Sequence, residues 1–161
     1  RSPSNRTEGL EPIREAVATA SARLGRQLKF LVGKPGLDGH SNGAEQIAAR
    51  ARDCGMDIHY EGIRLTPAEI VAAATAEKAH VVGLSILSGS HLPLIRETME
   101  RMRAAGLDHV PVVVGGIIPE EDAVTLRAMG VAAVYTPKDF ELNRIMLDIV
   151  ALVNPEAVAA E

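Results

Sequence analysis

The chain has 161 residues, the length of a single domain, and 47% of them are hydrophobic, which is enough for a full core. A net charge of −4 and an aromatic content of 2% disfavour nucleic-acid binding, because phosphates require a basic face and unpaired bases stack on aromatic rings. No apolar run approaches the roughly 20 residues of a membrane span, and the single cysteine, Cys54, fits a reducing cytoplasm.

The chain begins with a polar segment, residues 1–9, which we interpret as a linker. Apolar residues then recur at helical spacing over residues 10–25, and this pattern predicts a leading helix that Gly25 ends. Residues 26–153 are predicted to form one domain, and the alanine-rich residues 154–161 a flexible tail. Because the sequence lacks an initiator Met, we expect a fragment or subunit of something longer.

From residue 27 onward, predicted strands alternate with predicted helices. The strands are expected at 27–33, 56–62, 80–87, 110–116 and 131–136. The helices between and after them are expected at 43–54, 66–78, 91–105, 119–129 and 138–152. Thr66, Pro67 and Glu69 give the second of these helices a complete start signal, an N-cap with a capping-box acid.

Such alternation predicts an α/β fold, a five-stranded parallel sheet with helices on both faces. The expected architecture is flavodoxin-like (Rossmann-like), with strand order 2-1-3-4-5. In this order the chain reverses direction between strands 1 and 3, and ligands bind at the carboxyl ends of those strands. The topology therefore directs attention to the loops 34–42, 85–91 and 115–119.

The first of these loops lies within GKPGLDGHSNG, residues 33–43, which has neither the G-x-G-x-x-G of a dinucleotide site nor a P-loop. Asp38 precedes His40 by two residues, so its carboxylate can accept the Nδ1 proton and leave Nε2 facing outward. An imidazole held in this way can be a metal ligand or a general base, or it can simply cap the next helix. The pair alone does not decide among these three.

The remaining histidines, at positions 59, 80, 91 and 109, are too scattered for a zinc site. A single protein ligand suits a metal that brings most of its own coordination, as a corrin does.

Three pieces of sequence at the ends of strands 1, 3 and 4 together resemble cobalamin-binding domains. These are D-x-H-x-x-G at residues 38–43, S-x-L at residues 85–87 and G-G at residues 115–116. The resemblance covers roughly residues 27–153 and implies that cobalamin binds base-off, with His40 as the axial cobalt ligand.

The resemblance also implies roles for other residues. Asp38 would orient His40, Lys34 would pair with Asp38, and Gly39 and Gly43 would allow close approach to the cofactor. At the tail of the cofactor, Ser85 would donate to the free nitrogen of dimethylbenzimidazole and Leu87 would form an apolar wall. Gly115 and Gly116 would admit the flat base, and Tyr135 and Thr136 would line its pocket; these positions complete the expected set.

The spacing K-x-x-x-D-x-H, from Lys34 to His40, is similar to that of acyl-CoA mutases of the ethylmalonyl-CoA and methylmalonyl-CoA type. Those isomerases use adenosylcobalamin for a radical carbon-skeleton rearrangement, so the resemblance implies that this chain holds cofactor and contributes no catalytic residue. The acyl-CoA would be held by a TIM-barrel partner, fused or separate, in an oligomeric holoenzyme. The alternative is a corrinoid carrier for methyl transfer. A phosphorylated receiver domain is disfavoured, because it needs an aspartate where Ser85 stands.

Overall fold

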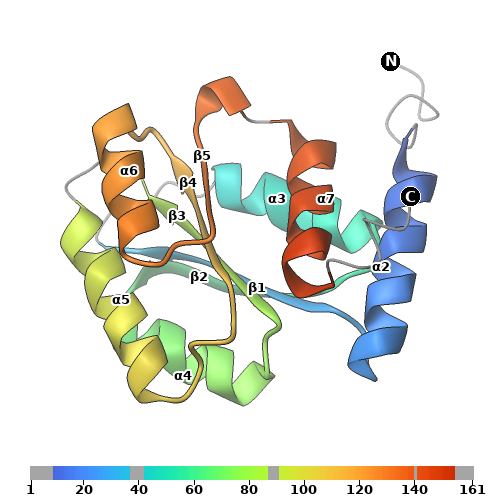
Figure 1. The fold of residues 1–161 in the computed structure, drawn as a ribbon, viewed down its shortest axis with the longest axis horizontal. Coiled ribbons are helices and arrows are strands. Elements are labelled where there is room, and N and C mark those ends of the chain that lie inside the picture. The colour runs from blue at the N-terminus through green and yellow to red at the C-terminus, as the bar shows by residue number, and fades with distance from the viewer. Residues whose placement is uncertain (1–8, 37–41, 87–90, 140, 155–161) are drawn as a thin grey trace.

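The computed structural model describes residues 9–36, 42–86, 91–139 and 141–154. Strands and helices alternate along these ranges, and Figure 1 labels them. The strands are β1 (Lys29–Pro35), β2 (Asp57–Leu65), β3 (Val81–Ile86), β4 (Val112–Gly116) and β5 (Ala133–Tyr135). The helices are α2 (Leu10–Leu24), α3 (Asn42–Asp53), α4 (Pro67–Glu77), α5 (Leu92–Ala104), α6 (Glu120–Ala128) and α7 (Leu142–Val153), with a 3₁₀ turn at Pro137–Asp139.

The described strands form one parallel sheet in the order β2-β1-β3-β4-β5. This confirms the predicted flavodoxin-like order, with its change of direction between β1 and β3. In a parallel sheet all strands end at the same edge, so the last residues of β1, β3, β4 and β5 lie along that edge.

The sheet separates two hydrophobic cores, and successive strand residues point alternately into each. On β1, Phe30 and Val32 pack with side chains of α2, α3 and α7, whereas Leu31 packs with those of α4, α5 and α6. Figure 1 shows the same layers, with α2, α3 and α7 on one face of the sheet and α4, α5 and α6 on the other. Because both faces are covered, the central strands are almost continuously apolar.

The leading helix α2 contributes to the first of these cores. Its apolar residues recur every three or four positions and so form one stripe along the helix. The buried members of this stripe are Leu10, Ile13, Ala16, Val17 and Ala20. The stripe packs against α7, and therefore α2 completes the layer of helices over this face of the sheet.

The first strand extends further than the sequence pattern predicts, and this changes the position of Lys34. The strand continues to Pro35 because β2 also continues, to Leu65, and these two residues pair. Irregular backbone on β2, with positive φ at Gly62 and Arg64, accompanies the shifts in register. Lys34, which we predicted in a loop, is consequently a strand residue with only 3% of its surface exposed.

The last helix begins later than its apolar pattern predicts, at Leu142 rather than at residue 138. Glu141 determines this start, because its carboxylate accepts hydrogen bonds from the backbone N–H groups of Asn143 and Arg144. Such an acceptor satisfies amide groups that have no partner within the first turn of a helix.

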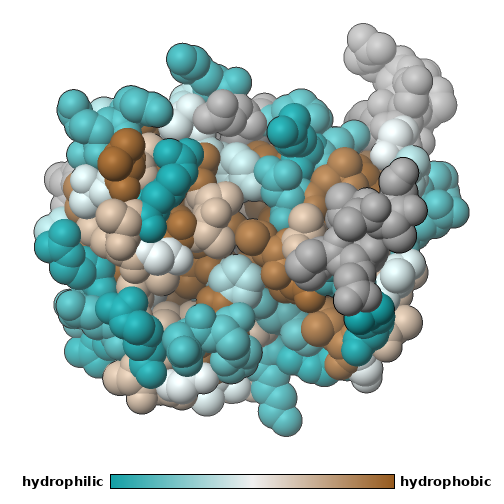
Figure 2. Space-filling view, in the orientation of Figure 1, coloured by the Kyte–Doolittle hydropathy of each residue, from teal (hydrophilic) through white to brown (hydrophobic). Residues whose placement is uncertain are grey.

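None of the described helices is long and apolar enough to cross a membrane. In the space-filling view of Figure 2, hydrophilic residues cover most of the outer surfaces of the helices, while apolar surface shows in the hollow between α6 and α7. Ile117 and Val124 are the large hydrophobic residues that are exposed within the described ranges. Apolar side chains thus reach the surface directly after β4 and on α6.

Candidate functional site

A pocket of about 390 Å³ lies between the sheet and the two helices α3 and α7, towards the carboxyl ends of the strands. Its volume falls within the range of ~300–1,000 Å³ that is usual for small-molecule sites. The lining residues are mostly apolar: Phe30, Val32, Gly83, Leu84, Ser85, Val113, Gly115, Gly116 and Tyr135 from the strands, Gly43, Ala44, Gln46, Ile47 and Ile145 from the helices, and Ile117, Thr136 and Pro137 from the connections.

Three of the residues that the sequence predicts for the site lie side by side in the floor of this pocket. Ser85 on β3 pairs with Gly115 on β4, and Gly115 pairs with Tyr135 on β5. In a parallel sheet, residues that pair in this way point to the same face. The three form one row across the sheet, with a hydroxyl at one end, open backbone in the middle and an aromatic ring at the other end.

The two adjacent glycines at the end of β4 leave space for different purposes. A Cβ at Gly115 would meet only Tyr135, at 3.7 Å from its carbonyl oxygen and 3.9 Å from its Cβ, and so would occupy free space in the pocket. A Cβ at Gly116 would instead lie 1.8 Å from the carbonyl oxygen of Ile86. Gly115 therefore keeps the pocket open, whereas Gly116 allows β3 and β4 to pair at their ends.

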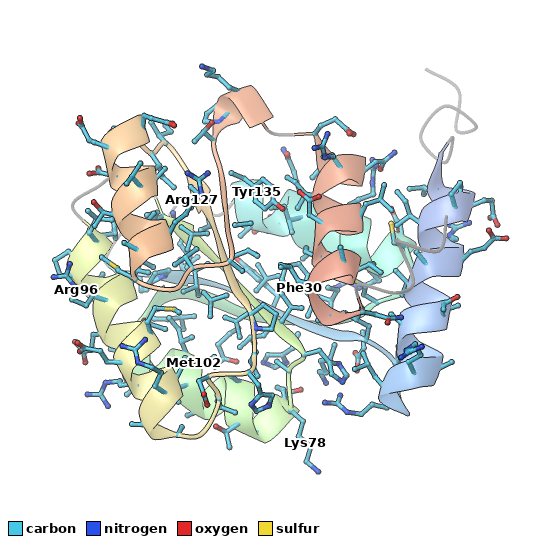
Figure 3. All side chains as sticks on the ribbon, viewed as in Figure 1. Phe30, Lys78, Arg96, Met102, Arg127 and Tyr135 are labelled. Carbon is cyan, nitrogen blue, oxygen red and sulfur yellow. The ribbon has the colours of Figure 1, made fainter. Side chains whose placement is uncertain are left out.

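Tyr135 is held in place by a hydrogen bond to α7. Its hydroxyl donates to Oδ2 of Asp148 at 2.8 Å, and only 8% of the residue is exposed. Burial, together with this hydrogen bond to a carboxylate, raises the pKa of Tyr135 far above its usual value, so the side chain stays neutral. Figure 3 shows Tyr135 and Phe30 between the sheet and α7, with Tyr135 nearer to the carboxyl edge.

Three further predicted residues fall inside the described ranges. Thr136 follows β5 and lines the pocket, as does Gly43 near the start of α3, where a Cβ would meet no atom within 4 Å. Lys34 does not line the pocket; it is buried on β1, close to where that strand ends.

The remaining predicted residues, Asp38, Gly39, His40 and Leu87, lie outside the described residues. The described chain leaves the sheet at Gly36, where φ is 87° and a Cβ would lie 2.7 Å from the ring of His91, so glycine suits this turn. Within the ranges that the structure describes, no group of three or more His, Cys, Asp or Glu side chains is placed to hold a metal ion.

The sequence analysis missed the deeper part of the pocket floor. Val32 on β1 pairs with Gly83 on β3, and Gly83 pairs with Val113 on β4, which gives a second row behind the first. Alternation along a strand could have identified two of these residues, because Gly83 and Val113 each lie two positions before a predicted site residue. Asp148 gave no such signal, since it is one polar residue on a helix without a motif around it.

A protein-family model described as "B12 binding domain" matches residues 28–140. An ethylmalonyl-CoA mutase of Cereibacter sphaeroides is 79% identical over 161 residues, which are 100% of this chain and 24% of that protein. A pivalyl-CoA mutase small subunit of Xanthobacter autotrophicus is 46% identical over 112 residues, which are 70% of this chain and 75% of that subunit.

The chain spans less than a quarter of the length of the ethylmalonyl-CoA mutases that it matches, 24% and 21% in two species. Among solved structures, the monomethylamine corrinoid protein of Methanosarcina barkeri is similar with a TM-score of 0.65 and 16% sequence identity, over 90% of this chain and 66% of that one. At this identity the likeness demonstrates a shared fold and nothing further.

Proposed function

Because the chain belongs to the family of B12-binding domains, we propose that its pocket takes up the dimethylbenzimidazole tail of a base-off cobalamin. The observation that carries the proposal is the row formed by Ser85, Gly115 and Tyr135 at the carboxyl ends of three strands. A flat, mainly apolar base needs a floor without side chains, apolar walls and one polar group for its ring nitrogen. Gly115 leaves the floor without a side chain, and the ring of Tyr135 contributes to the apolar walls. The hydroxyl of Ser85 can supply the polar group.

The roles nearest to cobalt are proposed from the sequence motif. His40 is the axial ligand, Asp38 orients its imidazole, and Gly39 lets the backbone approach the corrin. Lys34 is buried on β1 close to where that strand ends, four residues before Asp38, and is proposed to pair with that carboxylate. Leu87 is proposed as an apolar wall where the tail enters.

We infer further that this chain is the cofactor domain or small subunit of an acyl-CoA mutase. The relatives named above are CoA mutases, and 79% identity over the whole chain favours the ethylmalonyl-CoA type over the methylmalonyl-CoA type. When bound, adenosylcobalamin would supply an organic radical by homolysis of its cobalt–carbon bond. The residues of this chain would hold the lower face and the tail of the cofactor and would exclude water from the base.

The acyl-CoA substrate would then be held by a TIM-barrel partner within an oligomeric, cytoplasmic holoenzyme. Cys54 is a free and fully buried thiol, which agrees with a reducing compartment. A corrinoid carrier for methyl transfer has less support, because the solved corrinoid protein shares only the fold.

The axial bond provides the decisive experiment. We expect the Co(II) form of the complex, prepared with ¹⁵N-labelled histidine, to show an electron paramagnetic resonance signal coupled to one imidazole nitrogen of the protein. Replacing His40 by Ala (His40→Ala) removes that nitrogen, so the coupling should disappear and cobalamin affinity should fall by at least ~10–100-fold, the loss typical when only an outer partner of a metal-bound histidine is changed.

The matched control for this experiment is His109→Ala, which removes an exposed histidine between α5 and β4. It should leave both the coupling and the affinity unchanged. The assignment of His40 is wrong if the coupling survives His40→Ala. It is also wrong if the nitrogen coupled to cobalt in the unaltered protein belongs to dimethylbenzimidazole.

A further inference from the structure

We propose that Asp148 is a positioning residue for the nucleotide tail of the cofactor, because it fixes the ring of Tyr135 as an apolar wall of the pocket. This inference rests on the proposed function and deepens it. Asp148 does not line the pocket itself, so it would act on the bound base only through Tyr135.

The first support is the direction of the Tyr135 hydroxyl. It donates at 2.8 Å to a carboxylate outside the lining of the pocket, while the ring belongs to the lining. The polar end of this side chain is therefore already engaged by α7, and the ring is available for contact with an apolar base. With Phe30, Val113 and Ile145 also in the lining, Ser85 is left as the hydroxyl of the floor row that can meet a ring nitrogen.

The second support is the placement of Asp148 on α7. It follows Ile145 by three residues, so one turn of the helix supplies both a side chain that lines the pocket and the acceptor that holds Tyr135. Arg144 lies towards solvent, with its Nε 3.8 Å from Oδ1 of Asp148 and its side chain 75% exposed. The carboxylate thus lies between a buried hydroxyl and an exposed guanidinium.

Loss of this carboxylate would leave a buried hydroxyl without its acceptor, and an unsatisfied buried donor is costly. The side chain of Tyr135 would then turn to find another acceptor, either towards solvent or into the pocket. The first movement removes the wall and the second fills the space for the base. Both movements weaken binding of the tail and leave the corrin contacts unchanged.

The test compares two probes, hydroxocobalamin, which has the nucleotide tail, and aquocobinamide, which has the corrin without it. Their affinities for the 161-residue chain are measured by absorbance titration. We expect Asp148→Ala to weaken hydroxocobalamin binding about tenfold, as befits a lost hydrogen bond to a charged group. The affinity for aquocobinamide should stay the same. A merely structural role for Asp148 would change both affinities together.

Three variants sharpen this comparison. Asp148→Asn keeps an oxygen that can accept the Tyr135 hydroxyl proton, so it should retain most of the preference for hydroxocobalamin. Adding Asp148→Ala to Tyr135→Phe should change nothing more, because the group through which Asp148 acts is already absent. Glu97→Ala is the matched control: Glu97 is a similarly exposed helical carboxylate, paired with Arg101 at 2.8 Å on α5, and its loss should affect neither probe.

The outcomes separate this inference from the proposed function. If the unaltered chain binds neither probe, both are overturned. If it prefers hydroxocobalamin and Asp148→Ala keeps the full preference, the role of Asp148 is wrong while the proposed function stands. The role is equally wrong if Asp148→Ala still weakens tail binding in the Tyr135→Phe background.

Discussion

At the scale of single residues, the pocket depends on the absence of one side chain. Gly115 lies between Ser85 and Tyr135, and its missing Cβ leaves the space over which a flat base would lie. Its neighbour Gly116 has the same chemistry but a different surrounding, because the backbone of Ile86 occupies the corresponding space. Alanine substitution at these two positions should therefore separate binding from folding.

We predict that Gly115→Ala leaves the fold intact and weakens cobalamin binding. The new methyl group makes ordinary contacts with Tyr135, so stability should change by less than about 1 kcal/mol. The same methyl group occupies the pocket, and hydroxocobalamin affinity should fall about tenfold or more, since one carbon is worth that much in a tight pocket. Urea denaturation and absorbance titration measure the two quantities, and unchanged affinity would show that the base does not lie over Gly115.

Gly116→Ala serves as the comparison for this prediction. Its Cβ would lie 1.8 Å from the carbonyl oxygen of Ile86, so the ends of β3 and β4 would have to separate. The free energy of unfolding should fall by roughly 3 kcal/mol or more, a cost at the upper end for overpacked sites. If Gly116→Ala proved as stable as Gly115→Ala, the structural assignment of Gly116 would be wrong.

At the scale of elements, α4 offers a test of stability that does not touch the pocket. Thr66 Oγ1 accepts a hydrogen bond from the backbone N–H of Glu69 at 3.1 Å, and Oε1 of Glu69 accepts one from the N–H of Thr66 at 2.8 Å. We predict that Thr66→Ala costs about 1 kcal/mol of stability, the usual loss of such a cap. Because α4 covers the other face of the sheet, cobalamin affinity should stay unchanged. Parallel urea denaturation and titration check both statements, and a weakened affinity would contradict the second.

Helices whose ends carry local signals were predicted within one or two residues. The start of α4 is an example, since Thr66 and the proline after it determine the cap by themselves. Strand ends depend on pairing with distant residues. The sequence pattern therefore predicts Lys34 in a loop, whereas the pairing of Pro35 with Leu65 of β2 extends β1 past it. Among the described strands β5 pairs with β4 alone, and at Ala133–Tyr135 it is shorter than the predicted 131–136.

The topology alone brings some of the predicted site residues together. Ser85, Gly115 and Tyr135 end neighbouring parallel strands, so their meeting follows from the strand order. Asp148 could not be predicted in this way, because its contact with Tyr135 depends on how α7 crosses the sheet. The motif residue His40 lies outside the described residues and stays a prediction.

At the scale of the whole molecule, the two edges of the sheet differ in character. The carboxyl edge holds the apolar pocket, whereas the amino edge is fixed by polar contacts around Lys29 at the start of β1. Its ammonium group binds Glu77 at 2.7 Å and Asp57 at 3.2 Å, and its backbone N–H donates to Nδ1 of His80 at 2.9 Å. The last contact requires that Nδ1 of His80 carry no proton.

The pKa of His80 is consequently the property through which pH should act on stability. Burial is the main cause that lowers this pKa, and the positive charge of Arg26 lowers it further. Lys78 also lies around the same hollow at this edge, and its charge is positive like that of Arg26. The folded chain thus binds a proton at His80 less readily than the unfolded chain does.

We therefore predict that this contribution to stability is present above about pH 6.5, the ordinary pKa of histidine, and is lost as the pH falls below it, because the unfolded chain then binds more protons. The variant His80→Asn keeps an acceptor for the N–H of Lys29 but cannot titrate. Between pH 7.5 and pH 5.5 the unaltered chain should lose more unfolding free energy in urea than His80→Asn does. The other ionisable groups are present in both proteins, so their contributions cancel in the difference. His109→Asn, which removes an exposed histidine, should follow the unaltered chain, and equal losses in all three proteins would contradict the role of His80.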